Sequence, residues 1–189
     1  MEGINIKNPD LEHWRPLLRE WISLINKYCS KIYDDPVYCH LEKANVSILA
    51  AAAWKIGCMA VQELWVERQG HNTFCDLWIW HENEEPEYIE AKIEETVEKV
   101  KKCLSDAEKQ INKLDIKEEN RYKRISLCFI VPSIKKQSDI EKEIGKIIDN
   151  SFKIKSDILA WCFPPGKTRE YTYDNINIKP GILLFANKC

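Results

Sequence analysis

The residues best suited to chemistry lie in the middle of the chain: Asp76, and then Glu90, Ala91 and Lys92 in one apolar segment. Side chains alternate across a strand, so Glu90 and Lys92 share one face and Ala91 takes the other. A buried carboxylate or ammonium group costs free energy unless it is paired or holds a metal. These charged positions are therefore our first candidates for a functional site.

The chemistry that they suggest is metal-assisted hydrolysis. If the two segments pair as a hairpin, Asp76 lies beside Glu90, and each carboxylate raises the pKa of the other unless a cation separates them. Mg²⁺ suits such a site, because it takes one or two carboxylates and leaves positions for water and phosphate. Lys92 could orient the attacking water or stabilise charge on phosphoryl oxygens. These groups suffice to hydrolyse a phosphodiester.

The elements that must position these residues follow from hydrophobic periodicity. Three strands are predicted at 59–68, 74–80 and 88–93, with a turn at 69–72 and an acidic loop at 81–87. The acidic run in this loop is interpreted as a solvated hairpin tip, with an additional cation site at Glu82, Glu84, Glu85 and Glu87 as a minor alternative. One apolar stripe at helical spacing predicts a long helix from about 93 to 114. The other expected elements are helices at 11–32 (with Asp10 as N-cap), 41–56 and 139–150, and strands at 124–131, 157–163, 169–173 and 182–185.

This order predicts one α/β domain of 189 residues with a mixed sheet flanked by helices on both faces. We divide it into an N-terminal helical addition (1–40), a core (41–165) and a C-terminal β extension (166–189). Strands 124–131 and 157–163 read as covered on both faces, so Phe129 and Trp161 are expected to be almost fully buried.

Asp76 followed by Glu90-Ala91-Lys92 resembles the D…(D/E)xK signature of the PD-(D/E)XK, or restriction-endonuclease-like, nuclease superfamily. The resemblance covers roughly residues 40–165. It implies a Mg²⁺-dependent deoxyribonuclease in which Asp76 and Glu90 bind Mg²⁺, with Mn²⁺ able to substitute, and Lys92 assists the attacking water. Cys75 replaces the proline for which the family is named.

The same resemblance implies further site residues. An additional acid falls on Glu63, with Glu42 as the alternative, and a helical glutamine falls on Gln110. DNA is favoured over RNA only through the resemblance, and neither endo- nor exonuclease cleavage can be assigned. Two alternatives remain: a non-catalytic nucleic-acid-binding or regulatory subunit with this fold, and a structural role in which Glu90 pairs with Lys92 and Asp76 caps a turn.

Charge and composition bound the partners. The net charge is −2 and the pI about 6.1, so DNA would need a local basic patch. The expected DNA contacts are Arg68, Lys117, Arg121, Lys123, Arg124, Lys135 and Lys136. Most tryptophans are expected in the core. A homodimer or a place in a larger complex is compatible with the small size.

The eight cysteines are scattered without a CxxC pair, and no signal peptide or apolar run long enough to span a bilayer is seen. We therefore expect a cytoplasmic protein with reduced thiols and no membrane partner. Zinc at His71 and Cys75, or at Cys39 and His40, is a minor alternative. No phosphate-binding glycine loop, nucleophile elbow or HExxH occurs, which argues against P-loop NTPases, α/β-hydrolases and zincin proteases.

Overall fold

A computed structural model describes residues 1–189 except 33–34, 116–120, 136–138 and 167–176. The helices are α1 (Trp14–Lys31), α2 (Glu42–Lys55), α3 (Val100–Ile111) and α4 (Ile140–Phe152), with short 3₁₀ turns at Pro9–Leu11, Val37–Cys39 and Val97–Lys99. The strands are β1 (Glu2–Ile6), β2 (Met59–Arg68), β3 (His71–Trp80), β4 (Glu87–Glu94), β5 (Lys123–Ile130), β6 (Ile134–Lys135), β7 (Ile158–Cys162), β8 (Asn177–Ile178) and β9 (Ile182–Lys188).

The main sheet has seven strands in the order β1-β7-β9-β5-β4-β3-β2. Strands β2, β3 and β4 form an antiparallel meander, and β5 runs parallel to β4 after the crossover through α3. The sheet is therefore mixed, as the order of predicted elements indicated. Strands β6 and β8 form a separate small ribbon.

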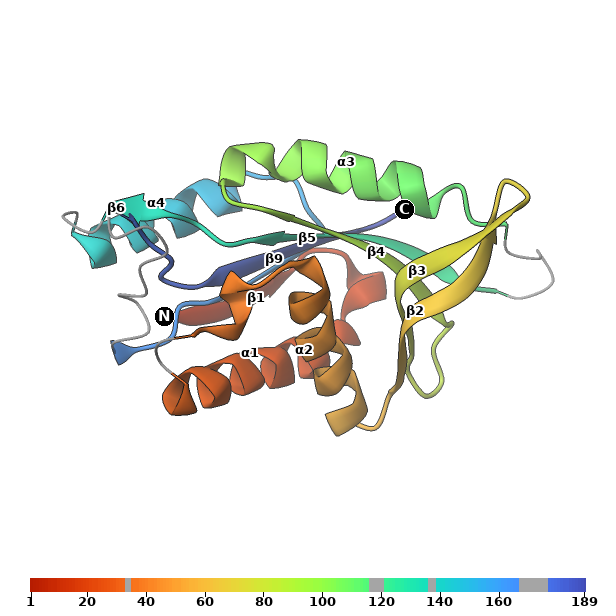
Figure 1. Cartoon of the computed structure of the whole chain (residues 1–189), viewed down its shortest axis with the longest axis horizontal. Coiled ribbons are helices and arrows are strands. Elements are labelled where there is room, and N and C mark those ends of the chain that lie inside the picture. Colours follow the sequence, from red (N-terminus) through yellow and green to blue (C-terminus); the bar gives the residue numbers. More distant parts are fainter. Residues whose placement is uncertain (33–34, 116–120, 136–138, 167–176) are drawn as a thin grey trace.

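Helices cover both faces of the sheet, which confirms the expected α/β layering (Figure 1). Helices α1 and α2 pack on one face through a large apolar cluster that contains Trp21, Leu49 and Phe129. Helices α3 and α4 pack on the other face through a second cluster that contains Leu104, Ile144 and Phe185. Alternation along β5 explains the division, because Phe129 and its neighbour Cys128 belong to opposite clusters.

Several expected boundaries move in the structure. Helix α1 begins at Trp14 with no side-chain cap, and Asn8, not Asp10, caps the 3₁₀ turn before it. Helix α3 begins only at Val100, because β4 continues to Glu94 and a 3₁₀ turn intervenes. Trp161 is only half-buried, where its ring meets Phe152 edge to face, so the expectation for this residue is wrong. Phe129 is fully buried, as expected.

Both ends of the chain contribute strands to the sheet. The first residues form β1, an edge strand on β7, so the segment 1–40 is not purely helical. Strand β9 lies between β5 and β7 in the interior of the sheet, antiparallel to both, so the C-terminal segment is central to the core. The strand expected at 169–173 lies outside the described residues.

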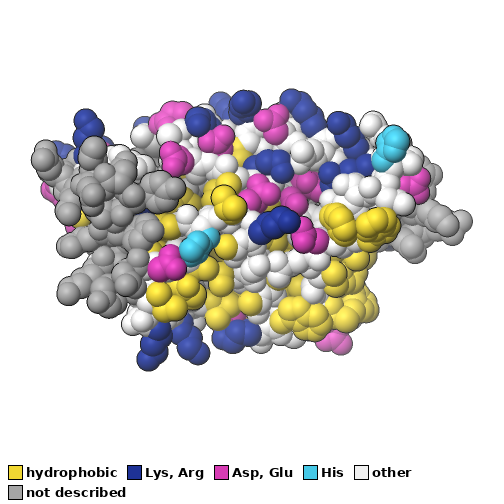
Figure 2. All heavy atoms as spheres, in the orientation of Figure 1, with side chains coloured by type: hydrophobic (Ala, Val, Ile, Leu, Met, Phe, Trp, Pro, Cys, Tyr) yellow, Lys and Arg dark blue, Asp and Glu magenta, His cyan; other side chains and the backbone are white. Residues whose placement is uncertain are grey.

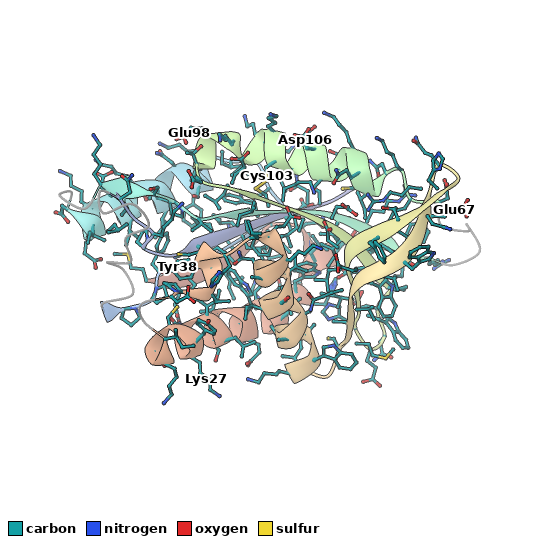
Figure 3. The ribbon with its side chains drawn as sticks, in the orientation of Figure 1. Lys27, Tyr38, Glu67, Glu98, Cys103 and Asp106 are labelled. Atoms are coloured by element: carbon teal, nitrogen blue, oxygen red, sulfur yellow. A yellow bond between two sulfur atoms is a disulfide. The ribbon has the colours of Figure 1, made fainter. Side chains whose placement is uncertain are left out.

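The cysteines are not all reduced. Cys103 of α3 and Cys128 of β5 form a disulfide that ties the helix to the sheet (Figure 3), which corrects the expectation of thiols throughout. Six further cysteines are free thiols. Among the described residues, no helix has the length and apolar character needed to cross a membrane.

Candidate active site at the fork between β3 and β4

The predicted site lies where β3 and β4 separate. Their ladder runs from Ile79–Glu87 to Leu77–Ile89 and ends there. Strand β4 nevertheless stays paired with β5 as far as Glu94. The edge of β4 that would have continued the pairing is thus open from Glu90 onward, and α2 packs close to it. We call this opening the fork.

Asp76 and Cys75 fill the fork from the β3 side. Asp76 Oδ2 accepts a hydrogen bond from the backbone amide of Ala91 at 2.8 Å. The Cys75 thiol donates to the carbonyls of Ile89 and Leu77 at 3.3 and 3.5 Å. At this point, side-chain hydrogen bonds from β3 to the backbone of β4 replace the backbone hydrogen bonds of the ladder. The amide that Asp76 contacts joins Glu90 to Ala91, so the Asp76 carboxylate lies against the backbone of the expected metal ligand.

Strand β2 is irregular at the neighbouring position. Glu63 has a φ of 49°, between the pairs Gln62–Leu77 and Leu64–Cys75. A positive φ costs a residue with a Cβ atom roughly 1–2 kcal/mol, and such strain gathers at functional sites. Glu63 and Asp76, which would have faced each other in the ladder, instead both line a pocket.

This pocket has a volume of about 230 Å³ and lies between α2 and the β2–β3 hairpin. Its lining residues are Glu42, Lys43, Val46, Ser47, Gln62, Glu63 and Asp76. Three of them carry carboxylates. Glu63 is partly exposed and paired with Lys43 at 2.5 Å. In Figure 2, acidic and basic side chains gather in the middle of this face, between the start of α2 and β4. The pocket thus offers the hard oxygen donors that Mg²⁺ prefers.

Lys92 reaches the same place from β4. Its Nζ donates to the carbonyl of Ala91 at 2.7 Å and lies 4.0 Å from Glu42 Oε2. Burial raises the pKa of Glu42, the charge of Lys92 lowers it and the charge of Asp76 raises it. Glu42 and Asp76 therefore repel each other across the pocket, which is the electrostatic setting in which a bound cation is stabilising.

Glu90 has a different partner. Its side chain is 3% exposed and forms an ion pair with Arg68, at the end of β2. Arg68 also donates to the carbonyl of Phe74 at 3.1 Å. The structural alternative had paired Glu90 with Lys92, but each has its own counter-charge: Arg68 for Glu90 and Glu42 for Lys92. Glu90 is also absent from the described lining of the pocket.

The residues expected to contact DNA differ in exposure, and some of them have partners within the protein. Arg121 and Lys135 are exposed, whereas Lys117 and Lys136 lie outside the described residues. Lys123 is buried and paired with Glu84 at 2.7 Å. The Arg124 guanidinium donates to the Leu114 carbonyl and the Tyr122 hydroxyl, and it also lies over the Tyr122 ring. Gln110 is half-buried in the last turn of α3.

The β2–β3 hairpin carries exposed aromatic residues near the fork. Trp65 and Phe74 are 61% and 49% exposed, and their rings meet edge to face at 5.0 Å. Trp54 and Trp80 are also exposed, and only Trp14 and Trp21 of the seven tryptophans are buried, so the expectation that most tryptophans face the core is wrong. Figure 2 shows hydrophobic side chains over this hairpin.

A second polar cluster escaped the sequence analysis. His13, His81 and Glu87 meet at the opposite end of β4, although Glu87 was expected in a solvated tip and is fully buried. No local spacing signals this cluster, because His13 is far from the other two in sequence. Among the described residues, neither His71 with Cys75 nor Cys39 with His40 belongs to a group of three metal-ligating side chains.

We compared the chain with models of protein families, with curated proteins and with solved structures, and none of them matches it.

Proposed function

We propose that the protein is a Mg²⁺-dependent nuclease of the restriction-endonuclease-like type that acts on DNA. The observation that carries the proposal is the fork. Asp76 contacts the amide between Glu90 and Ala91, and the amine of the next residue, Lys92, faces the carboxylate of Glu42. The order of these residues along the chain is that of the D…(D/E)xK signature, and the Asp76 carboxylate and the Lys92 amine both lie at the fork, whereas the Glu90 carboxylate is paired with Arg68.

The residues of the pocket fit Mg²⁺. Asp76, Glu42 and Glu63 line the same pocket, and Glu42 and Asp76 repel without a cation, although among the described residues the three carboxylates do not form a preassembled group of metal ligands. When bound, Mg²⁺ would lower the pKa of a water molecule and polarise a phosphoryl oxygen. Lys92 would orient that water or stabilise charge on the phosphate, because its three donors can reach beyond the Ala91 carbonyl.

Glu90 can join the metal ligands only when Arg68 releases it. Arg68 was expected to contact DNA, and a phosphate group offers its guanidinium an alternative bidentate partner. DNA binding would therefore free Glu90 as it draws Arg68 away. The exposed rings of Trp65 and Phe74 beside the site offer a surface for stacking unpaired bases.

The second candidate is a DNA-binding or regulatory protein that does not cleave. The Arg68–Glu90 ion pair favours it, because a carboxylate held by an internal guanidinium is neutralised without metal. The two candidates differ in turnover, and both predict that DNA binds near the fork.

The test is cleavage of linear, circular and single-stranded DNA with Mg²⁺, Mn²⁺ or EDTA. We expect cleavage with either metal and none with EDTA, and a loss of at least about 10²-fold in Asp76→Asn and Lys92→Met. Glu98→Gln and Lys101→Met are matched controls, since both residues are exposed near the start of α3, and Glu98 is labelled in Figure 3. DNA binding without cleavage by the wild type would leave the second candidate. If the protein neither binds nor cleaves DNA, both proposed functions are overturned.

A further inference from the structure

A buried group of two imidazoles and one carboxylate joins three elements of the fold. His13 precedes α1, His81 follows β3, and Glu87 begins β4. One ligand atom from each lies within 4.8 Å of the others. The His13 and His81 side chains are 14% and 7% exposed, and that of Glu87 is fully buried.

The distances between these atoms are close to those of a metal centre. His13 Nε2 lies 2.8 Å from Glu87 Oε1, and His81 Nε2 lies 3.7 Å from Glu87 Oε2. Ligands at about 2.0–2.1 Å from a tetrahedral zinc ion are roughly 3.3–3.4 Å from one another. The two distances to Glu87 lie on either side of this spacing, and all three ligand atoms are within 4.8 Å of one another, so modest side-chain shifts would bring them to a common metal ion.

One of these atoms lacks a partner. His81 Nε2 is buried and has no hydrogen-bond partner among the described residues. The other ring nitrogen, Nδ1, lies 3.2 Å from the Cys58 sulfur. If Nδ1 carries the proton and donates it to that sulfur, Nε2 presents a lone pair toward Glu87. A buried acceptor without a donor costs free energy, and a bound cation would remove this cost by accepting the lone pair of His81 Nε2.

Glu87 also has an outer hydrogen-bond partner, as metal ligands usually do. Trp14 Nε1 donates to Glu87 Oε2 at 2.8 Å, which fixes the carboxylate. His13 Nδ1 lies 4.0 Å from Glu84 Oε2, and Lys123 in turn holds Glu84 at 2.7 Å. Glu84 thus lies beside the His13 ring, although it is beyond hydrogen-bond distance of Nδ1.

We infer that His13, His81 and Glu87 form a binding site for a transition-metal dication of the Zn²⁺ class, separate from the fork. Two imidazoles and one carboxylate suit Zn²⁺ far better than Mg²⁺, which prefers oxygen ligands alone. Three protein ligands leave a fourth position for water. Glu87 and Glu90 are three residues apart on β4, roughly 10 Å along a strand, so one metal ion cannot serve both sites.

A metal ion bound at this site would link three elements of the fold. It ties the residue before α1 to both strands that enter the fork, and α1 packs beside α2, whose first turn lines the active-site pocket. Metal binding would therefore stabilise the folded chain in proportion to its affinity, since the three ligands come together only in that state.

The first experiment titrates EDTA-dialysed full-length protein with Co²⁺ and then Zn²⁺. We expect visible bands of tetrahedral Co²⁺, their loss on addition of Zn²⁺, and a higher Tm with either metal. His13→Gln, His81→Gln and Glu87→Gln should lose the bands and the Tm shift. His40→Gln and His71→Gln are matched controls that should keep both, because these histidines are exposed. Asp76→Asn should also keep both, which separates this site from the fork.

Buried variants can fail to fold, so a second experiment uses the wild type alone. NMR of the ring nitrogens should show that Zn²⁺ shifts two of the four histidines, through Nε2. Shifts of His40 or His71 instead would overturn the inference, as would intense thiolate-to-Co²⁺ charge-transfer bands. An absence of metal binding would also overturn it and leave a structural contact between His13 Nε2 and Glu87 Oε1.

Discussion

Arg68 and Glu90 form a buried ion pair that joins the end of β2 to the open edge of β4. Lys92, two residues further along β4, takes Glu42 as its partner instead. Glu90 therefore starts in a neutralised state, and any role as a metal ligand must include the release of Arg68. The stability of this pair is the first quantity to measure.

Arg68→Gln should destabilise the metal-free protein by about 3–5 kcal/mol, because it leaves the Glu90 carboxylate buried without a counter-charge. The double variant Arg68→Gln/Glu90→Gln should recover much of that loss. Lys109→Gln serves as the control, since its pair with Asp106 is exposed on α3 and should contribute less than about 1 kcal/mol. Urea unfolding measures all of these.

The same variant separates the two proposed functions. If Glu90 is a latent metal ligand, Mg²⁺ should stabilise Arg68→Gln more than it stabilises the wild type, because the freed carboxylate can bind it. If the pair is only structural, Mg²⁺ should leave both melting curves where they are.

Replacement of Asp76 tests the pocket itself. Without metal, Asp76→Asn should be no less stable than the wild type, because the amide oxygen can still accept from Ala91 while the repulsion with Glu42 disappears. The wild type should gain about 2.7 kcal/mol in Mg²⁺ at a hundredfold excess over the dissociation constant, and the variant much less. Thermal melts with EDTA, with Mg²⁺ and with Mg²⁺ plus a DNA duplex measure this. Equal destabilisation of Asp76→Asn in all three conditions would indicate a structural role.

Local patterns predicted much of the fold. The β2–β3–β4 meander, the α3 crossover and buried β5 follow from alternation, turn residues and one apolar stripe, all of which are properties of neighbouring residues. The place of β9 could not be found this way. A short apolar run such as Ile182–Phe185 indicates burial, but it does not say between which strands the segment lies.

The candidate site was predictable only in part. Asp76 and Lys92 stand out because charged residues interrupt apolar strands. The end of the β3–β4 ladder after Leu77–Ile89 and the positive φ of Glu63 on β2 are not encoded by any local pattern. The pairing of Glu90 with Arg68 and the meeting of His13 with His81 are long-range outcomes of packing.

The core gives a prediction independent of function. Phe129→Ala should cost about 3–5 kcal/mol, because the side chain is fully buried and its ring stacks on Trp21 at 6.5 Å. Trp161→Ala should cost less than Phe129→Ala, because the Trp161 ring is only half-buried. Denaturant unfolding compares the two. A loss below about 1 kcal/mol for Phe129→Ala would contradict the burial of β5.

The thiols predict a dependence of stability on pH. Burial raises the pKa of Cys29 to about 12 and that of Cys75 to about 11, from an ordinary value near 9.0. Since the folded protein holds these protons more tightly than the unfolded chain, stability should be complete below pH 9 and fall as pH rises from about 9 toward 11 and 12. At pH 8 a thiol reagent should label exposed Cys189 quickly and Cys29 and Cys75 only on unfolding. Cys103 and Cys128 should stay unlabelled until a reductant is added, because they are joined as a disulfide. Rapid labelling of Cys75 in the folded protein would show that the fork is open to solvent, and the hydrogen bonds of its thiol to Ile89 and Leu77 would then not persist in solution.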